Sequence, residues 1–155
     1  MNIIPSILLP IIANRTASTL NLFEIMKGKK VIIFGVPGAF TPTCSEKHLP
    51  GFIKLSDKIK SKGVDDIYCL SVNDVYVMKS WLFNYTHNEK IIGIADGNAE
   101  FSKLNDLSID KSSSFMGMRC KRFAMIIKNN EIKKKFIEEA GQFVISSAEH
   151  ILSEI

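Results

Sequence analysis

One stretch of the sequence constrains the fold more than any other: an apolar run followed by a loop that ends at a cysteine. Residues 31–35 form a continuous apolar run with the length of a buried strand. A loop over residues 36–44 follows it, and residues 45 to about 62 have the amphipathic spacing of a helix. In open α/β sheets, ligands bind beyond the carboxyl ends of the strands. The sequence therefore predicts a functional loop that ends at Cys44.

The residues around Cys44 suit the start of a helix. Thr41 is a favourable N-cap and Pro42 a favourable first helical residue, which makes Cys44 the third residue of the helix. Unpaired backbone N–H groups and the positive end of the helix dipole stabilise a thiolate there, and the thiolate is the nucleophilic form. A buried cysteine in an ordinary capped helix is the alternative. The residues alone leave both interpretations open.

Length and composition indicate one ordinary globular domain. The 155 residues, 46% hydrophobic and 23% charged, are enough for a single domain over residues 1–155 with a core of its own. The net charge is +4, and the lysine clusters at residues 27–30 and 133–135 are interpreted as solvated turns. Because no aromatic residues interleave them, nucleic acid is not an expected partner.

The cysteines and histidines show no pattern of a disulfide scaffold or a metal site. An odd number of cysteines without scaffold spacing favours a reducing compartment, and we expect the cytoplasm, or an organelle if a targeting segment was removed. No metal is expected. We interpret the histidines as exposed or partly buried residues without a role. The residues concerned are Cys44, Cys69, Cys120, His48, His87 and His150.

The N-terminal stretch, residues 1–13, is apolar but short. It cannot span a bilayer, and Pro5 and Pro10 interrupt it. We expect an extended segment that packs on the domain, with a signal peptide as the alternative, and no membrane partner.

The rest of the chain alternates between strand and helix patterns. Gly63 should end the Cys44 helix, Pro50 and Gly51 should kink it, and Asn129 with Asn130 should form a hairpin turn. A last helix is expected to start at Ser146, with Glu149 completing a capping box. The pattern predicts helices over residues 19–26, 74–87 and 98–105, and strands over residues 30–35, 66–72, 91–95, 122–127 and 132–138. This order predicts an α/β, thioredoxin-like fold with a central mixed β-sheet flanked by helices.

Residues 28–52 resemble the peroxiredoxins, whose motif Pro-x-x-x-Thr-x-x-Cys is intact as Pro37, Thr41 and Cys44. The type II or type 5 subfamily is the most similar. Residues 69–74, 77–81, 119–123 and 143–152 also agree with it. The resemblance covers the chain from about residue 20, whereas residues 1–19 match poorly, and five separated motifs are more specific than one.

The resemblance implies a thiol-specific peroxidase that reduces hydrogen peroxide and alkyl hydroperoxides without a bound cofactor. Cys44 would be the peroxidatic cysteine that becomes a sulfenic acid. Arg122 would favour the thiolate and polarise the peroxide. Thr41 would hydrogen-bond the sulfur and the peroxide, and Pro37 would shield the thiolate from water.

Each of these residues also has a simpler interpretation. Thr41 is suited to a helix cap, and one residue can fill both roles. Arg122 sits among apolar residues and could be a strand residue whose charged end reaches solvent, although apolar Phe123 should face the opposite side of the strand. Arg119 also matches a family arginine, with a supporting role and a plain surface charge both open.

The way in which oxidised Cys44 is reduced stays open. Ile145 stands where some type 5 members carry a resolving cysteine, whereas Cys69 matches a second cysteine of plant-type members. Because Cys69 should lie buried in a strand, it is either a resolving or a core residue. Cys120 lies two positions before Arg122, so in one strand both side chains would point to the same face. Cys120 should therefore lie near the site, in a regulatory or a packing role. The resemblance points to glutathione with glutaredoxin, or to thioredoxin, as the electron donor.

The resemblance also implies a homodimer, with the Phe40 loop and the helix that holds Trp81 and Phe83 at its interface; a core position for Trp81 is the alternative. A peroxide sensor or redox relay that passes oxidation to a partner protein is the alternative function. A non-catalytic binding module is a third hypothesis, and the intact motif residues argue against it.

Overall fold

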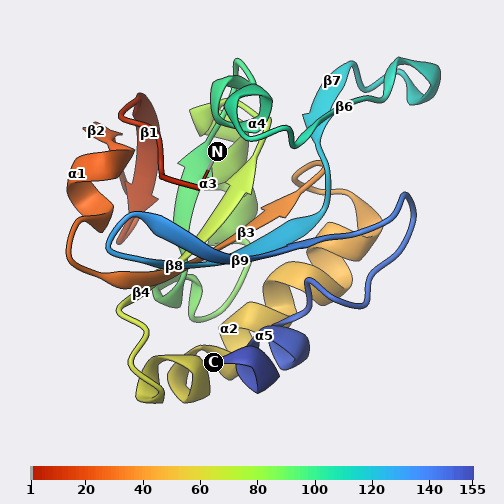
Figure 1. The fold of residues 1–155 in the computed structure, drawn as a ribbon. Coiled ribbons are helices and arrows are strands. Elements are labelled where there is room, and N and C mark those ends of the chain that lie inside the picture. Colours follow the sequence, from red (N-terminus) through yellow and green to blue (C-terminus); the bar gives the residue numbers. More distant parts are fainter. Residues whose placement is uncertain (1) are drawn as a thin grey trace.

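A computed structural model describes residues 2–155 and contains a seven-stranded mixed sheet (Figure 1). Met1, which the predictions for the N-terminus and the domain include, lies outside the described residues. The strand order is β2-β1-β5-β4-β3-β8-β9, with β3, β4 and β5 mutually parallel and the others antiparallel to their neighbours. The strands are β1 (Leu8–Ala13), β2 (Thr16–Asn21), β3 (Lys30–Val36), β4 (Asp66–Ser71), β5 (Ile92–Ala95), β8 (Phe123–Lys128) and β9 (Glu131–Ile137).

Helices cover both faces of this sheet, as the strand pattern of β3 requires. Ile32 and Phe34 point to one face and pack in a core with α2, α3 and α5, while Val31 and Ile33 point to the other and pack with α1 and α4. The helices are α1 (Leu22–Met26), α2 (Leu49–Ser61), α3 (Val75–Phe83), α4 (Glu100–Leu104) and α5 (Ala148–Glu154). Figure 1 shows α2 and α5 side by side below the sheet. The predicted thioredoxin-like α/β fold is confirmed.

The N-terminal segment is more regular than predicted. It is extended, but as a β1–β2 hairpin whose first strand also pairs with β5, so it completes the main sheet. Asn14 and Arg15 form its turn, both with positive φ. The helix predicted over residues 19–26 is wrong at its start, because residues 19–21 belong to β2 and α1 begins at Leu22.

A second hairpin was not predicted. Strands β6 (Ser108–Asp110) and β7 (Met118–Cys120) form a separate two-stranded sheet that projects from the body at the upper right of Figure 1. The strand predicted over residues 122–127 begins at Phe123 instead. Cys120 and Arg122 therefore lie in different segments, and the argument that they share the parity of one strand is wrong.

Several smaller boundaries differ from the predictions. The Asn129–Asn130 turn is confirmed, with φ values of 46° and 65°, whereas α3 ends at Phe83 rather than at residue 87. The last helix is capped by Ser147, whose hydroxyl accepts from the N–H of His150. The predicted cap, Ser146, is buried and has other partners, described below.

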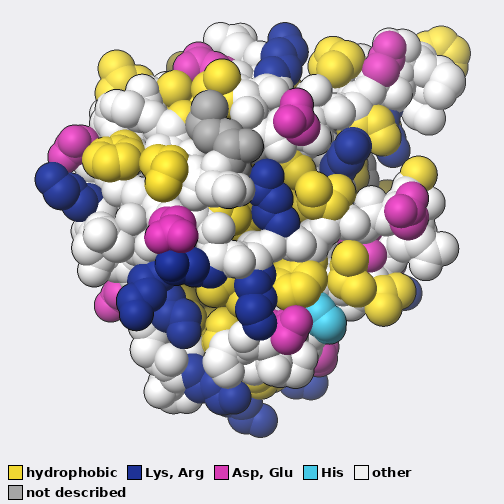
Figure 2. Space-filling model, in the orientation of Figure 1, with side chains coloured by type: hydrophobic (Ala, Val, Ile, Leu, Met, Phe, Trp, Pro, Cys, Tyr) yellow, Lys and Arg dark blue, Asp and Glu magenta, His cyan; other side chains and the backbone are white. Residues whose placement is uncertain are grey.

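Lysine and arginine side chains gather at the lower left of the face in Figure 2, around the end of the sheet where β3 begins. Cys44 follows the opposite, carboxyl end of β3, so this basic region is far from it. Within residues 2–155, no helix has the length and apolar character needed to cross a membrane.

Candidate active site

The helix that carries Cys44 opens with an irregular turn. It begins at Pro42 as predicted, but residues Cys44–His48 form a π-helical turn in which the N–H of Leu49 donates to the carbonyl of Cys44. Such turns are rare and are frequent at functional sites. This π-helical turn lies directly before Pro50 and Gly51, where the sequence analysis expected a kink, and α2 continues from Leu49 to Ser61.

Helix α3 and the residues just after it hold the irregular turn at Ser45. Trp81 Nε1 donates to Ser45 Oγ at 3.0 Å, and the Tyr85 hydroxyl donates to the Ser45 carbonyl at 2.8 Å. Because Pro50 has no N–H, it cannot donate to that carbonyl along the π-helical ladder, and the tyrosine takes this place. Trp81 is buried, so the interpretation that placed it in the core is confirmed.

Arg122 lies directly against Cys44. One guanidinium nitrogen, Nη2, donates to Cys44 Sγ at 3.2 Å, across 78 positions of sequence. Cys44 forms no disulfide, and its side chain is fully buried. A guanidinium is always charged, and its fixed positive charge stabilises negative charge on the sulfur. The structure thus brings together the cysteine and the arginine that the sequence analysis paired.

His48 holds Arg122 in place, a role that the sequence analysis missed. Arg122 Nη1 donates to His48 Nδ1 at 3.0 Å, and His48 Nε2–H donates to the Ser146 carbonyl at 2.8 Å. These two bonds fix the imidazole as the neutral Nε2–H tautomer. The interpretation of His48 as exposed or partly buried was wrong, since its side chain is fully buried. Its position one helical turn after Cys44 was the available signal.

The segment after β9 completes this arrangement through Glu138. Glu138 Oε2 accepts three hydrogen bonds, from Val144 N at 2.7 Å, Ser146 N at 2.9 Å and Ser146 Oγ at 2.7 Å. The carboxylate therefore fixes the loop that presents the Ser146 carbonyl to His48. Phe143, from the same loop, packs edge-on against the His48 ring, with centroids 5.1 Å apart, and its ring faces Arg122.

Thr41 and Pro37 lie in the loop before Cys44. The Thr41 hydroxyl donates to the Gly38 carbonyl at 2.6 Å, and the Thr41 carbonyl accepts from Ser45 N at 2.9 Å. Thr41 thus starts the helix with its backbone while its hydroxyl closes the loop. The expected hydrogen bond from Thr41 to the sulfur is therefore not formed, because the single hydroxyl proton is donated to Gly38. Asn73 Oδ1 fixes the same loop by accepting from Ala39 N at 3.0 Å. Pro37 lines a cavity beside Arg122.

Arg119 supports the loops rather than the sulfur. Its Nε donates to the Met116 carbonyl at 2.9 Å and its Nη1 to the Val72 carbonyl at 3.3 Å. The first bond lies within the β6–β7 hairpin, and the second ties the hairpin to the end of β4. Of the two interpretations of Arg119, the supporting one agrees with this geometry.

The other two cysteines are buried free thiols. Burial raises the pKa of Cys69, in β4, well above its usual value, and the neighbouring Cys44 adds to this shift. Burial likewise raises the pKa of Cys120 to about 12, and its thiol donates to the Val36 carbonyl at 3.1 Å. Both side chains are therefore uncharged thiols, which are poor nucleophiles.

The cavity beside Arg122 also holds Cys120, which confirms that Cys120 lies near the site. Among residues 2–155, no group of three or more His, Cys, Asp or Glu side chains is arranged to hold a metal ion. The arrangement is that of a thiol redox site: a cysteine at a helix start, and a cation on its sulfur.

The comparisons with known proteins agree with this class. The Redoxin family matches residues 4–152. The chain is 45% identical over 142 residues to Peroxiredoxin-2D of Arabidopsis thaliana, covering 92% of this chain and 88% of that protein. A structure of reduced Prx3 from Vibrio vulnificus in complex with hydrogen peroxide has 43% identity and a TM-score of 0.92, covering 98% of this chain and 95% of that chain. The 1-Cys peroxiredoxin of Plasmodium falciparum has 36% identity and a TM-score of 0.88, covering 97% and 94% of the two chains.

The chain belongs to the redoxin family and, within it, to the peroxiredoxins. It is a thiol peroxidase, an oxidoreductase that reduces peroxides with electrons from a thiol donor and needs no prosthetic group.

The neutral state of His48 makes the stability of the fold depend on pH. Burial, and next the charge of Arg122, lower the pKa of His48 from 6.5 to about 3. Below pH 6.5 His48 therefore binds a proton in the unfolded chain but stays neutral in the folded chain, down to about pH 3. The contribution of His48 to the free energy of unfolding is full above pH 6.5 and is lost as the pH falls. From about pH 7 to about pH 5, the free energy of unfolding should fall about 2 kcal/mol further in the wild type than in His48→Gln.

Urea unfolding at the two pH values, at one protein concentration, measures this difference. Glutamine suits the comparison because its amide can donate to Ser146 and accept from Arg122 without titrating. Parallel pH profiles for the two proteins would contradict the buried neutral imidazole.

Proposed function

We propose that Cys44 is the peroxidatic cysteine for hydrogen peroxide and alkyl hydroperoxides. The observation that carries this proposal is the bond of 3.2 Å from Arg122 to Cys44 Sγ. The thiolate attacks one peroxide oxygen, an S–O bond forms as the O–O bond breaks, and the leaving oxygen takes a proton to become water or an alcohol. Arg122 stabilises the charge that moves from sulfur to oxygen, Thr41 positions the peroxide, and Pro37 limits water access.

We propose further that an external thiol reduces the sulfenic acid. A first thiol displaces water and forms a mixed disulfide with Cys44, and a second thiol attacks this disulfide and regenerates Cys44. Glutathione with glutaredoxin, or thioredoxin, is the donor in this scheme. Cys69 acts as a core residue rather than a resolving cysteine, which its full burial in β4 and its raised pKa support.

Hydrogen peroxide consumption by the purified protein tests this scheme. The wild type and Cys69→Ser are compared with glutathione plus glutaredoxin in one assay and thioredoxin plus its reductase in another. We expect steady turnover with at least one donor, at the same rate in both proteins to within about twofold, because Cys69 takes no part in the chemistry.

Other outcomes separate the alternatives. A Cys44–Cys69 disulfide in peptide maps of the oxidised protein, with loss of turnover in Cys69→Ser, would make Cys69 a resolving cysteine. A single rapid oxidation of Cys44 without turnover in either assay would favour the peroxide sensor or redox relay.

We also propose that the protein is a single domain over residues 1–155, acts as a homodimer and works in a reducing compartment such as the cytoplasm. The pairing of β1 with β5 in one sheet supports the single domain. Phe40 and Phe115, both exposed apolar side chains, support an interface at the loops around the site. Three free thiols support the reducing compartment.

A further inference from the structure

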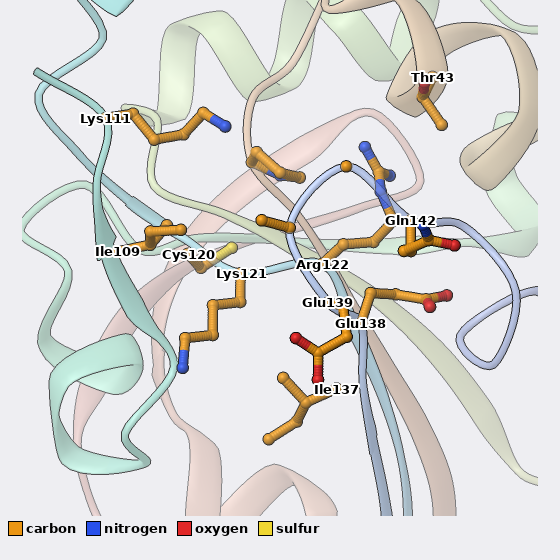
Figure 3. Close-up of a pocket in the computed structure, with 13 residues that line it drawn as sticks. Thr43, Ile109, Lys111, Cys120, Lys121, Arg122, Ile137, Glu138, Glu139 and Gln142 are labelled. Atoms are coloured by element: carbon orange, nitrogen blue, oxygen red, sulfur yellow. The ribbon is translucent and has the colours of Figure 1, made fainter. Parts of the chain in front are cut away.

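A cavity beside the cysteine is far larger than hydrogen peroxide requires. Its volume is about 500 Å³, and Thr43 and Arg122 are among the residues that line it (Figure 3). Arg122 connects the cavity to Cys44, because its guanidinium donates to Cys44 Sγ. A water molecule takes about 30 Å³, so hydrogen peroxide, roughly the size of two waters, fills a small part of this space. The volume matches the pockets that proteins use for organic ligands.

The walls of the cavity combine apolar surface with unpaired positive charge. Ile109 and Ile137 line it together with Lys111 and Lys121. Lys111 and Lys121 are half-buried, and within residues 2–155 neither forms an ion pair with a carboxylate. An ammonium group that is partly removed from water and lacks a partner favours an anionic ligand.

The backbone holds both lysines at the β6–β7 hairpin. The Lys111 N–H donates to the Gly117 carbonyl at 2.7 Å, and the Lys121 N–H donates to the Leu107 carbonyl at 2.7 Å. In Figure 3, Lys111 and Lys121 lie on one side of the cavity and Arg122 on the other. A ligand between them meets apolar walls and positive charge together.

The acidic residues of the cavity do not cancel this charge. Glu138 is buried, and its Oε2 is occupied by three hydrogen bonds from the loop after β9. Glu139 is exposed to solvent, where its charge is screened. The three cations Lys111, Lys121 and Arg122 outnumber these two carboxylates, so the lining of the cavity carries a net positive charge.

We propose that this cavity binds the organic part of a carboxylate-bearing hydroperoxide, with Lys111 and Lys121 facing the carboxylate. The inference rests on the proposed function, because the peroxide end must reach Cys44. The apolar surfaces of Ile109 and Ile137 contact the carbon skeleton, and Lys111 and Lys121 determine substrate specificity.

The bond from Arg122 to the Cys44 sulfur favours a peroxide as the occupant. The guanidinium that lines the cavity also stabilises the thiolate that attacks a peroxide. In the reaction, the Cys44 thiolate forms an S–O bond with the terminal hydroxyl oxygen of the peroxide as the O–O bond breaks, and Cys44 becomes a sulfenic acid. The alkoxide takes a proton and leaves as a carboxylate-bearing alcohol.

The test uses two hydroperoxides that differ in one group. Cumene hydroperoxide is compared with its para-carboxylate, and the single oxidation of Cys44 is followed by rapid mixing without reductant. We expect the wild type to react about tenfold faster with the carboxylate at low ionic strength, and the preference to shrink as salt is added.

The variants locate this preference. The double variant Lys111→Gln with Lys121→Gln should react with both organic hydroperoxides at about the same rate, while its rate with hydrogen peroxide changes less than about twofold. The matched control, Lys58→Gln with Lys62→Gln, removes the same charge at the far end of α2. It should keep the preference of the wild type.

Three results would overturn the proposal. Equal wild-type rates for the two organic hydroperoxides would show that there is no preference for the carboxylate. If the control variant lost this preference as much as the double variant does, the preference would depend on net charge rather than on Lys111 and Lys121. A lysine effect confined to the thiol reduction step would make a thiol the occupant. Failure of hydrogen peroxide itself to oxidise Cys44 would instead defeat the proposed function, so the two failures are distinguishable.

Discussion

Replacing Cys44 by serine is expected to abolish peroxide reduction completely. The hydroxyl of serine does not ionise under these conditions, and Arg122 alone cannot replace the lost nucleophile. Neither remaining cysteine can substitute, because burial holds both as uncharged thiols. Peroxide consumption measures the loss of turnover. Mass spectrometry of a trapped sulfenic acid shows whether another cysteine reacts with the peroxide.

Cys120→Ser is the matched control for this experiment. It removes one thiol of the same cavity wall and leaves Cys44 with Arg122, so turnover should persist within about threefold of the wild type. Measurable turnover in Cys44→Ser, or a sulfenic acid on another cysteine, would refute the assignment of the nucleophile.

Replacing Arg122 by methionine should slow the formation of the sulfenic acid by about a hundredfold to a thousandfold, the typical effect of removing one preorganised donor at a site of developing charge. Methionine keeps much of the length of the side chain but cannot donate to Cys44 Sγ or to His48. Rapid mixing of the reduced variant with hydrogen peroxide measures the rate, and circular dichroism checks that the fold is intact.

Arg119→Met separates the charge at the sulfur from positive charge nearby. Arg119 bonds to the carbonyls of Met116 and Val72 and lies three positions before Arg122 in the sequence. Its loss should slow the reaction by less than about tenfold, through looser loops rather than a missing donor. If the rate of sulfenic acid formation falls equally in the two variants, or does not fall in Arg122→Met, Arg122 does not act on the reacting atoms.

The parts of the fold that could be predicted are those that local patterns determine. The apolar run of β3 predicts a strand that is buried on both faces. Asn129 and Asn130 predict a hairpin because asparagine tolerates positive φ, and both residues adopt it. Short polar strands such as β2 have no such pattern, so the N-terminal hairpin was missed.

The parts of the site that could not be predicted depend on partners far away in the sequence. The position of His48 one helical turn after Cys44 places it near the site, but it does not indicate that the ring joins Arg122 to the Ser146 carbonyl, 98 positions later. Ser146 and Ser147 are both suitable caps in isolation, and the buried carboxylate of Glu138 decides between them by binding Ser146. The role of Lys111 and Lys121 was not predicted either, because only the β6–β7 hairpin, which was also not predicted, brings them to the same cavity as Arg122.

These long sequence separations also determine at which stage of folding Cys44 becomes a reactive thiol. The Cys44–Arg122 bond spans 78 positions and the His48–Ser146 bond spans 98, so both must wait until nearly the whole chain is in place. A chain that is still being synthesised exposes Cys44 without a guanidinium on its sulfur and without the loop that fixes His48. Unfinished or unfolded copies therefore carry an ordinary thiol, and peroxide chemistry is confined to molecules that have completed folding.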